Sequence, residues 1–193
     1  MNFFTADSHF SLYDEYVIYR DFRPFESLKK MNEEIINLWN KQAGKGDMIY
    51  HLGDFINYNY KDMDHEPLLK LVQKLNAKVV LILGNNEKRV MSNVFNGNFE
   101  KFKEYLLSLG FFDVYENGLN LKIGEKDFKL VHCPKDSDKT SEYNLFGHIH
   151  RCVFAKSYGF NVGVDNHNYK MFSESEIHEL YERREFFDEN VYN

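Results

Sequence analysis

The chain has 193 residues, of which 24 are Lys or Arg and 30 are Asp or Glu, so its formal charge is −6. Hydrophobic residues make up 43% and aromatic residues 17%, which excludes an intrinsically disordered chain. The length predicts a single domain over residues 1–193. No apolar run approaches the roughly 20 residues of a membrane-spanning helix, the amino terminus lacks the basic region of a signal peptide, and the basic residues are scattered. We therefore expect a cytoplasmic protein with neither a membrane nor nucleic acid as a partner.

Short apolar runs alternate with amphipathic stretches in the first half of the chain, which predicts an α/β fold. In chain order we expect a strand over 3–6, a helix over 24–40, a strand over 47–53, a helix over 67–75, a strand over 78–83 and a helix over 99–109. The second half changes character, with short runs separated by Gly, Asn and Asp. These predict antiparallel or mixed strands over 111–115, 119–123, 128–132, 143–146 and 160–164, followed by a last helix that begins near Ser173.

Side chains that can bind a metal follow apolar runs at several points along the chain. The five blocks are Asp7-Ser8-His9, Gly53-Asp54, Gly84-Asn85, His132 and Gly147-His148-Ile149-His150. Any one block alone is more typical of a cap or a turn. In an open α/β sheet, however, the carboxyl ends of the strands form one crevice, so blocks remote in sequence can converge there. Carboxylates, imidazoles and one amide oxygen are ligands for Mn, Fe, Zn or Ni rather than for a thiolate cluster.

The five blocks, in this order, resemble the calcineurin-like metallophosphoesterases. Arg23-Pro24-Phe25 and the segment 51–55 resemble the small, single-domain bacterial and phage branch of that family. The resemblance implies a four-layer α/β/β/α sandwich of two mixed sheets, located in the host cytoplasm if the chain is phage-encoded. It also implies two divalent transition-metal ions, Mn²⁺ first, with Fe, Zn or Ni as alternatives. One ion would bind Asp7, His9, Asp54 and His150, and the other Asp54, Asn85, His132 and His148, with Asp54 bridging.

Such a pair of ions suits the hydrolysis of a phosphate ester. Two cations roughly 3.5 to 4 Å apart neutralise the phosphate and hold a bridging hydroxide near neutral pH. We therefore expect a metal-dependent phosphoric ester hydrolase that acts on a small phosphate ester. Neither Ser8 nor Cys133 has a neighbour in sequence that suggests a covalent nucleophile, and Cys133 and Cys152 are interpreted as structural thiols.

Two positions depart from the family pattern. Asn86 stands where the family usually has a histidine that protonates the leaving oxygen; an amide donates a hydrogen bond but no proton. Leu12 stands where this branch often has a further histidine. Because some phosphodiesterases of the superfamily also lack the first histidine, the resemblance favours a phosphodiesterase for a small, possibly nucleotide, diester. A phosphomonoesterase or protein phosphatase, and a weakly active or inactive metal-binding interaction module, remain as alternatives.

Several further residues are candidates for roles beside the metal ions. Arg23, Lys88 and Arg89 are candidates for phosphate binding, and His167 is the candidate substitute acid. His51 is a candidate to donate a hydrogen bond to a metal ligand. Tyr58 and Tyr60 are the aromatic residues considered for stacking against a nucleobase.

Overall fold

The first sheet carries the parallel strands that the first half of the sequence predicts. The computed structural model describes residues 1–11, 23–58 and 65–183, so Leu12 and Tyr60 lie outside the described residues. The sheet has the order β10-β1-β2-β3-β4, with β1 to β4 parallel and β10 antiparallel to β1. Its strands are β1 (Asn2–Thr5), β2 (Met48–His51), β3 (Lys78–Ile82), β4 (Asp113–Tyr115) and β10 (Phe172–Ser173).

The second sheet is mixed and comes from the second half of the chain. Its order is β5-β6-β7-β9-β8, in which β6, β7 and β9 are parallel and the two edge pairs are antiparallel. Its strands are β5 (Leu119–Ile123), β6 (Lys126–Leu130), β7 (Asn144–Phe146), β8 (Ala155–Lys156) and β9 (Gly159–Asn161). Short 3₁₀ turns, η2 (Pro134–Asp136) and η3 (Val164–Asn166), follow β6 and β9, so the strand expected over 160–164 ends early.

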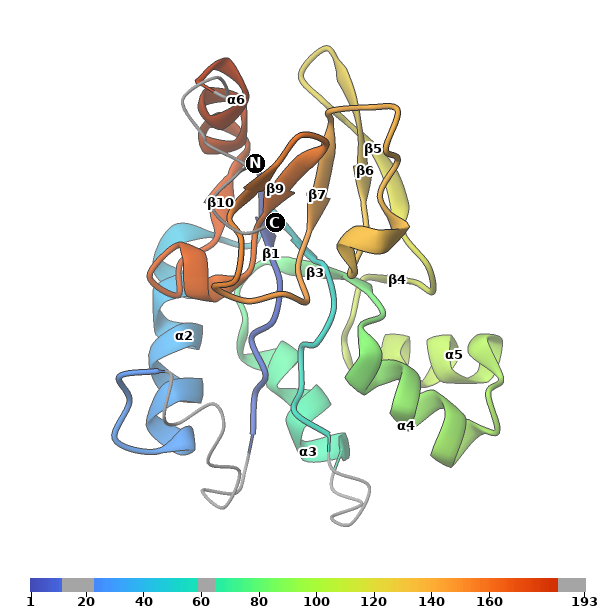
Figure 1. Ribbon diagram of the computed structural model, residues 1–193. Coiled ribbons are helices and arrows are strands. Elements are labelled where there is room, and N and C mark those ends of the chain that lie inside the picture. Colours follow the sequence, from blue (N-terminus) through green and yellow to red (C-terminus); the bar gives the residue numbers. More distant parts are fainter. Residues whose placement is uncertain (12–22, 59–64, 184–193) are drawn as a thin grey trace.

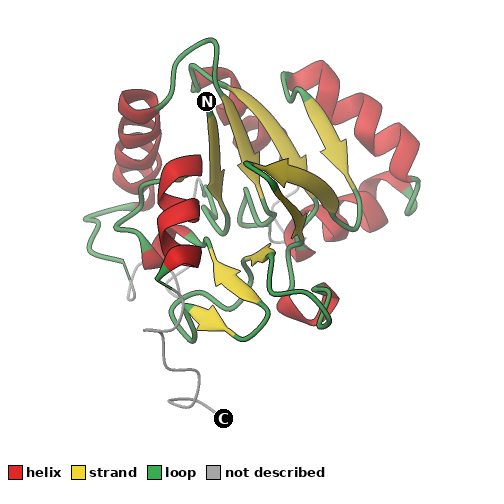
Figure 2. Ribbon diagram, turned by 90° about the horizontal axis from the view of Figure 1, so that it is seen from above, coloured by secondary structure: helices red, strands yellow, loops and turns green. Residues whose placement is uncertain are grey.

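Helices cover the two sheets and complete the predicted α/β/β/α sandwich (Figures 1 and 2). They are α2 (Leu28–Gln42), α3 (His65–Leu69) continued by the 3₁₀ helix η1 (Lys70–Lys74), α4 (Asn85–Phe95), α5 (Phe99–Leu109) and α6 (Glu174–Glu182). Figure 1 shows α2 to α5 in one half of the molecule and the second sheet with α6 in the other. In the described ranges, no helix is long and apolar enough to cross a membrane.

Two apolar cores lie on opposite faces of the first sheet because successive side chains of a strand point to opposite faces. Phe3 of β1 belongs to the core shared with α2 to α5, which includes the fully buried Trp39. Its neighbour Phe4 belongs to the core between the two sheets, with Phe160 and, from α6, Ile177. The first sheet is thus buried on both faces, and the second sheet packs against one of them.

Candidate metal centre

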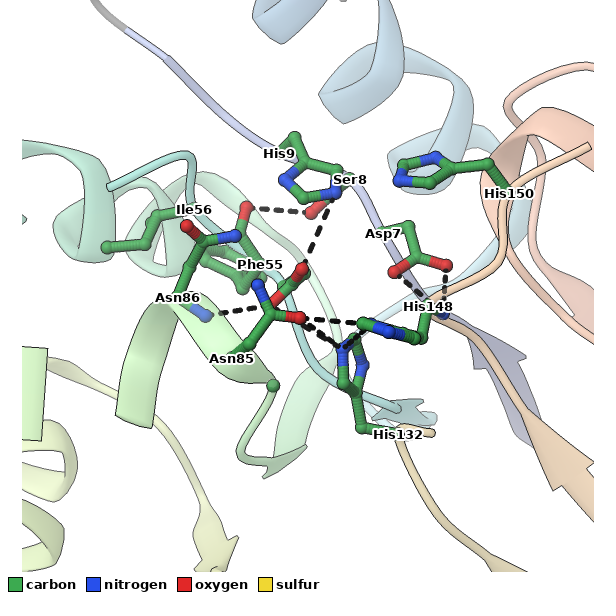
Figure 3. A network of polar contacts seen from close by, with 12 residues as sticks. Asp7, Ser8, His9, Phe55, Ile56, Asn85, Asn86, His132, His148 and His150 are labelled. Carbon is green, nitrogen blue, oxygen red and sulfur yellow. Dashed lines mark hydrogen bonds and ion pairs between the residues drawn. The ribbon is translucent and has the colours of Figure 1, made fainter. Parts of the chain in front are cut away.

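All seven predicted metal ligands lie at the carboxyl ends of strands, where the two sheets face each other. Asp7 and His9 follow β1, Asp54 follows β2, and Asn85 is the first residue of α4 directly after β3. The second sheet contributes the other three, because His132 follows β6 and His148 and His150 follow β7. Figure 3 shows the labelled side chains among them turned toward one another from the two sides; they are Asp7, His9, Asn85, His132, His148 and His150. The convergence expected from the sequence is therefore present.

The ligand atoms form two groups. Group A consists of Asp7, His9 and His150, and group B of Asp54, His132 and His148; within each group the potential ligand atoms lie within 4.8 Å of one another. The two carboxylate oxygens of Asp54 divide between the groups. Its Oδ2 lies 3.7 Å from Nε2 of His9, and its Oδ1 lies 3.7 Å from Nε2 of His132. One carboxylate can therefore serve both groups.

Group B is arranged for a cation rather than for hydrogen bonding alone. Nδ1 of His132 lies 2.8 Å from the carbonyl oxygen of Leu52, and because a carbonyl only accepts, this nitrogen carries the proton. Nε2 of His132 is then a lone pair, and it faces Oδ1 of Asn85 at 3.1 Å and Nδ1 of His148 at 3.1 Å. Nε2 of His132 and Oδ1 of Asn85 can both only accept, so they repel each other unless the Nδ1–H of His148 or a cation lies between them. The donor set therefore fits a divalent ion.

The backbone at the centre is held in an uncommon conformation. Five of the seven predicted ligands have φ between 48° and 73°, the left-handed region that non-glycine residues rarely adopt; they are Asp7, His9, Asp54, His148 and His150. Such conformations cost of order 1–3 kcal/mol each and persist where the surrounding structure enforces them, typically at functional sites. Here they turn side chains of two sheets into one cluster.

Gly53 and Gly84 allow the loops after β2 and β3 to touch. A Cβ atom at Gly84 would lie 2.2 Å from the backbone nitrogen of Asp54 and 2.3 Å from its Oδ1. A Cβ atom at Gly53 would lie 2.6 Å from Cα of Gly84 and from Nδ1 of His132. The glycine before each ligand is therefore required by the close approach of backbone to ligand, as the sequence pattern suggested.

Glu87 connects these two loops by hydrogen bonds, a role that the sequence did not indicate. Its Oε2 accepts hydrogen bonds from the backbone nitrogens of Asp54 and Gly84, each at 2.9 Å, and its Oε1 accepts from that of Ile56 at 3.2 Å. In return, Oδ1 of Asp54 accepts from the backbone nitrogen of Asn86 at 2.9 Å, which caps α4. The same carboxylate that serves both groups thus begins the helix that carries Asn85.

Burial shifts the protonation states of the side chains in the cluster. It lowers the pKa of His9, His132 and His148, so these rings are neutral ligands near pH 7. Burial, together with the charge of Asp54, raises the pKa of Asp7 to about 7. Carboxylates crowded in this way favour a bound cation, and binding it displaces protons.

His150 is held by Asp165, a second residue that the sequence did not single out as functional. Nδ1 of His150 lies 2.8 Å from Oδ2 of Asp165. Burial opposes ionisation of Asp165, but the hydrogen bond from His150 and the charge of Arg23 outweigh it and lower the pKa of Asp165 to about 2. The ionised carboxylate therefore accepts the Nδ1 proton, which leaves Nε2 of His150 as the ligand atom. Only the position of Asp165, four residues after β9 ends at Asn161, hints at this role in the sequence.

Arg23 lies in the interior instead of at a phosphate-binding surface. Its side chain is 1% exposed and forms an ion pair with Asp165. Its guanidinium also donates to the carbonyl oxygens of Asp7 and Ser8. The phosphate-binding role expected for Arg23 does not fit this position, because its donors are directed at protein groups.

The other cationic candidates lie on α4. Lys88 is half-buried and donates to Oδ1 of Asn117 at 3.1 Å, and Arg89 is exposed. Their contact with a phosphate stays a prediction.

The remaining candidates lie beside or away from the cluster. His167 stacks on Phe172 with ring centroids 4.1 Å apart and pairs with Glu176 at 3.3 Å, so the structure directs it to α6 rather than to the metal ligands. Tyr58 is 6% exposed, which does not suit stacking against a ligand. Nε2 of His51 lies 2.9 Å from Oγ of Ser8, the residue between Asp7 and His9, so this bond goes to a neighbour of two candidate ligands and not to a ligand itself.

Comparison with known proteins agrees with this geometry. The family model of the calcineurin-like phosphoesterases matches residues 3–185. An uncharacterised protein of Methanocaldococcus jannaschii is 30% identical over 193 residues, covering 94% of this chain and 91% of that protein. A solved protein of unknown function from Aquifex aeolicus superposes with a TM-score of 0.63 at 25% identity, covering 93% of this chain and 98% of that one. A solved archaeal phosphodiesterase is more distant, with a TM-score of 0.47 at 17% identity over 84% of this chain and 81% of that one.

Proposed function

Because the chain belongs to the calcineurin-like phosphoesterase family, we propose that it is a dinuclear metal-dependent phosphodiesterase that hydrolyses a small phosphodiester. The observation that carries the proposal is the position of Asp54, whose two carboxylate oxygens each lie 3.7 Å from a histidine of a different group. When bound there, two divalent cations such as Mn²⁺ would neutralise the phosphate and supply hydroxide from water at neutral pH. We assign Asp7, His9, Asp54 and His150 to one ion, and Asp54, Asn85, His132 and His148 to the other.

Asn86 supplies a hydrogen bond to the substrate rather than a proton. Its Oδ1 accepts from the backbone nitrogen of Tyr58 at 3.3 Å, which fixes the orientation of the amide. Figure 3 shows the amide nitrogen turned toward the cluster and the oxygen away from it. Nδ2 of Asn86 is thus directed to where a phosphoryl oxygen would lie, and a neutral donor there stabilises charge in the transition state.

The supply of positive charge favours a diester over a monoester. Of the arginines that the structure describes, Arg23 is the buried one, and its guanidinium is directed at Asp165 and backbone carbonyls. Arg23 therefore supplies no clamp for a monoester dianion, whereas a diester carries one negative charge and needs less compensation.

The test compares the hydrolysis of bis(p-nitrophenyl) phosphate and p-nitrophenyl phosphate by the full chain with Mn²⁺ added. We expect kcat/KM for the diester to exceed that for the monoester by about tenfold or more. Asp54→Asn should lose both activities, and the matched control Asp127→Asn, at an exposed position of β6, should keep them. Preference for the monoester would contradict the proposal, and Mn²⁺ binding without turnover of either ester would indicate an interaction module.

A further inference from the structure

Arg23 is tied to the metal centre by four hydrogen bonds. Its Nε and Nη2 donate to Oδ1 and Oδ2 of Asp165 at 2.9 and 3.0 Å. Its Nη2 also donates to the carbonyl oxygen of Asp7 at 2.7 Å, and its Nη1 donates to that of Ser8 at 2.8 Å. The planar fork of a guanidinium fits this set, since one side chain satisfies a bidentate carboxylate and two separate carbonyls.

These contacts lead to the ligands of group A. The carbonyls of Asp7 and Ser8 belong to the segment that carries Asp7 and His9, whose φ angles of 59° and 49° lie in the left-handed region. Asp165 holds Nδ1 of His150, the third member of the group, at 2.8 Å. One side chain thus restrains the backbone of two ligands and, through a carboxylate, the ring of the third.

Group B is held by different residues. Arg23 donates to Asp165, to the carbonyl oxygens of Asp7 and Ser8 and to Sδ of Met31, none of which belongs to group B. Its ligands are fixed instead by the carbonyl of Leu52 on His132 and by Glu87 on the backbone of Asp54. Arg23 thus supports ligands of group A and Glu87 supports Asp54 of group B, while the backbone nitrogen of His148 joins the groups by donating to Oδ2 of Asp7 at 2.8 Å.

The charge and the geometry of Arg23 act on a group A cation in opposite directions. The positive charge of the guanidinium repels a metal ion bound at group A. After burial, the same charge is a further cause that lowers the pKa of His9. Its hydrogen bonds, by contrast, hold the ligands in the conformation that binds a cation. If only its charge mattered, its removal would strengthen metal binding; if its bonds matter more, removal weakens it.

We infer that Arg23 is a positioning residue for the group A metal ion alone, acting through the carbonyls of Asp7 and Ser8 and through Asp165. The inference rests on the proposed dinuclear function. Loss of an outer residue that orients a metal ligand typically costs about 10- to 100-fold in metal affinity. We expect a loss of this size at group A in variants of Arg23 and unchanged affinity at group B.

The experiment measures Mn²⁺ binding without any substrate, by calorimetric titration of the metal-free full chain, and assigns the two ions by anomalous scattering from crystals. Arg23→Gln removes the positive charge and most of the hydrogen-bond donors of the guanidinium. Arg23→Lys keeps the charge next to Asp165 but cannot reach both carbonyls at once, and it covers the case in which Arg23→Gln fails to fold. Arg151→Gln is the matched control, because Arg151 is an exposed arginine next to His150 that donates to the hydroxyl of Tyr169.

Selective weakening of the group A ion in Arg23→Lys, with the control like the wild type, supports the inference. Equal weakening at both groups would show a general structural role and overturn it. Unchanged or tighter binding at group A would also overturn it, because the charge of Arg23 would then outweigh its bonds. A wild-type chain that binds no Mn²⁺ would instead contradict the proposed function, so the two failures are distinguishable.

Discussion

Replacement of Asn86 by histidine tests the chemistry at the leaving group. The backbone N–H of Tyr58, which now donates to Oδ1 of Asn86 at 3.3 Å, would face Nδ1 of a new imidazole. Nε2 would then carry the proton and take the place of the amide nitrogen that is turned toward the cluster. Glu87 is not available to orient the ring, because its two oxygens accept three backbone N–H groups. The new histidine should therefore act as a weakly supported general acid.

The size of the effect follows from burial. Asn86 is 3% exposed, and burial lowers the pKa of the histidines already in the cluster. An imidazole whose pKa is lowered by burial is mostly neutral at pH 7, and its protonated fraction increases as the pH falls to 6. General-acid help of about 10², the low end of its usual range, is then realised only in part at pH 7 and more fully at pH 6.

The assay compares kcat/KM for alkyl and aryl diesters in the wild type and Asn86→His from pH 6 to 8 with saturating Mn²⁺. We expect the gain for alkyl esters alone, since an aryl leaving oxygen hardly needs a proton, and we expect it to fall as the pH rises. Asn86→Leu serves as the control that removes the hydrogen-bond donor, and it should slow both ester classes alike. An equal gain for both classes in Asn86→His, or a gain that grows with pH, would refute the reasoning.

Three further predictions concern the support of the ligands. Gly84→Ala should abolish Mn²⁺ binding, because the new Cβ would lie 2.2 Å from the backbone nitrogen of Asp54 and displace this ligand. Elemental analysis of the folded variant measures its metal content, and a wild-type content would contradict this close contact. In the metal-free protein, burial and the charge of Asp54 raise the pKa of Glu87 to about 8, so its folded form retains a proton that the unfolded chain has released. The free energy of unfolding should therefore fall as the pH rises from about 5 to 7, by up to about 3 kcal/mol from this group. Urea unfolding at several pH values should show a weaker pH dependence for Glu87→Gln than for the wild type. An equal pH dependence in the two proteins would exclude Glu87 as the cause. His150→Ala and His148→Ala should each lose a different ion, seen as the loss of different anomalous peaks, whereas loss of the same peak in both would contradict the division into groups A and B.

The clustering of the candidate ligands could be predicted in part, because each lies within four residues of the end of a strand. Short apolar runs locate the strands, and parallel strands of one sheet end at a common edge, so Asp7, Asp54 and Asn85 are expected to lie close together. That the second sheet would supply His132 and His148 to the same edge came from the family resemblance, because antiparallel or mixed strands with short loops leave several arrangements open.

The helix α4 could not be predicted, because its start depends on contacts across the fold. Asn85 and Asn86 have low helix propensity and follow a glycine, which is typical of a loop. The carboxylate of Asp54, more than 30 residues earlier, caps the backbone nitrogen of Asn86, and Glu87 completes the turn by accepting from Gly84. A local pattern carries the Glu87 contact but not the Asp54 contact.

The role of Arg23 was misjudged for a related reason. An arginine near presumed site loops is by default exposed, and exposure suits phosphate binding. Its burial depends on Asp165, which lies 142 residues further along the chain. Neither residue has a neighbour in sequence that indicates this ion pair, so only the folded arrangement shows it.

The number of metal ions needed for turnover tests the dinuclear assignment most directly. The metal-free full chain is titrated with Mn²⁺ while bound metal and hydrolysis of bis(p-nitrophenyl) phosphate are measured in the same samples. Because the oxygens of Asp54 lie 3.7 Å from a histidine of each group, we expect two ions per chain at saturation. We also expect activity to follow the fraction of chains that hold both ions. Full activity with one ion per chain, or activity that survives removal of the metal by a chelator, would contradict the account.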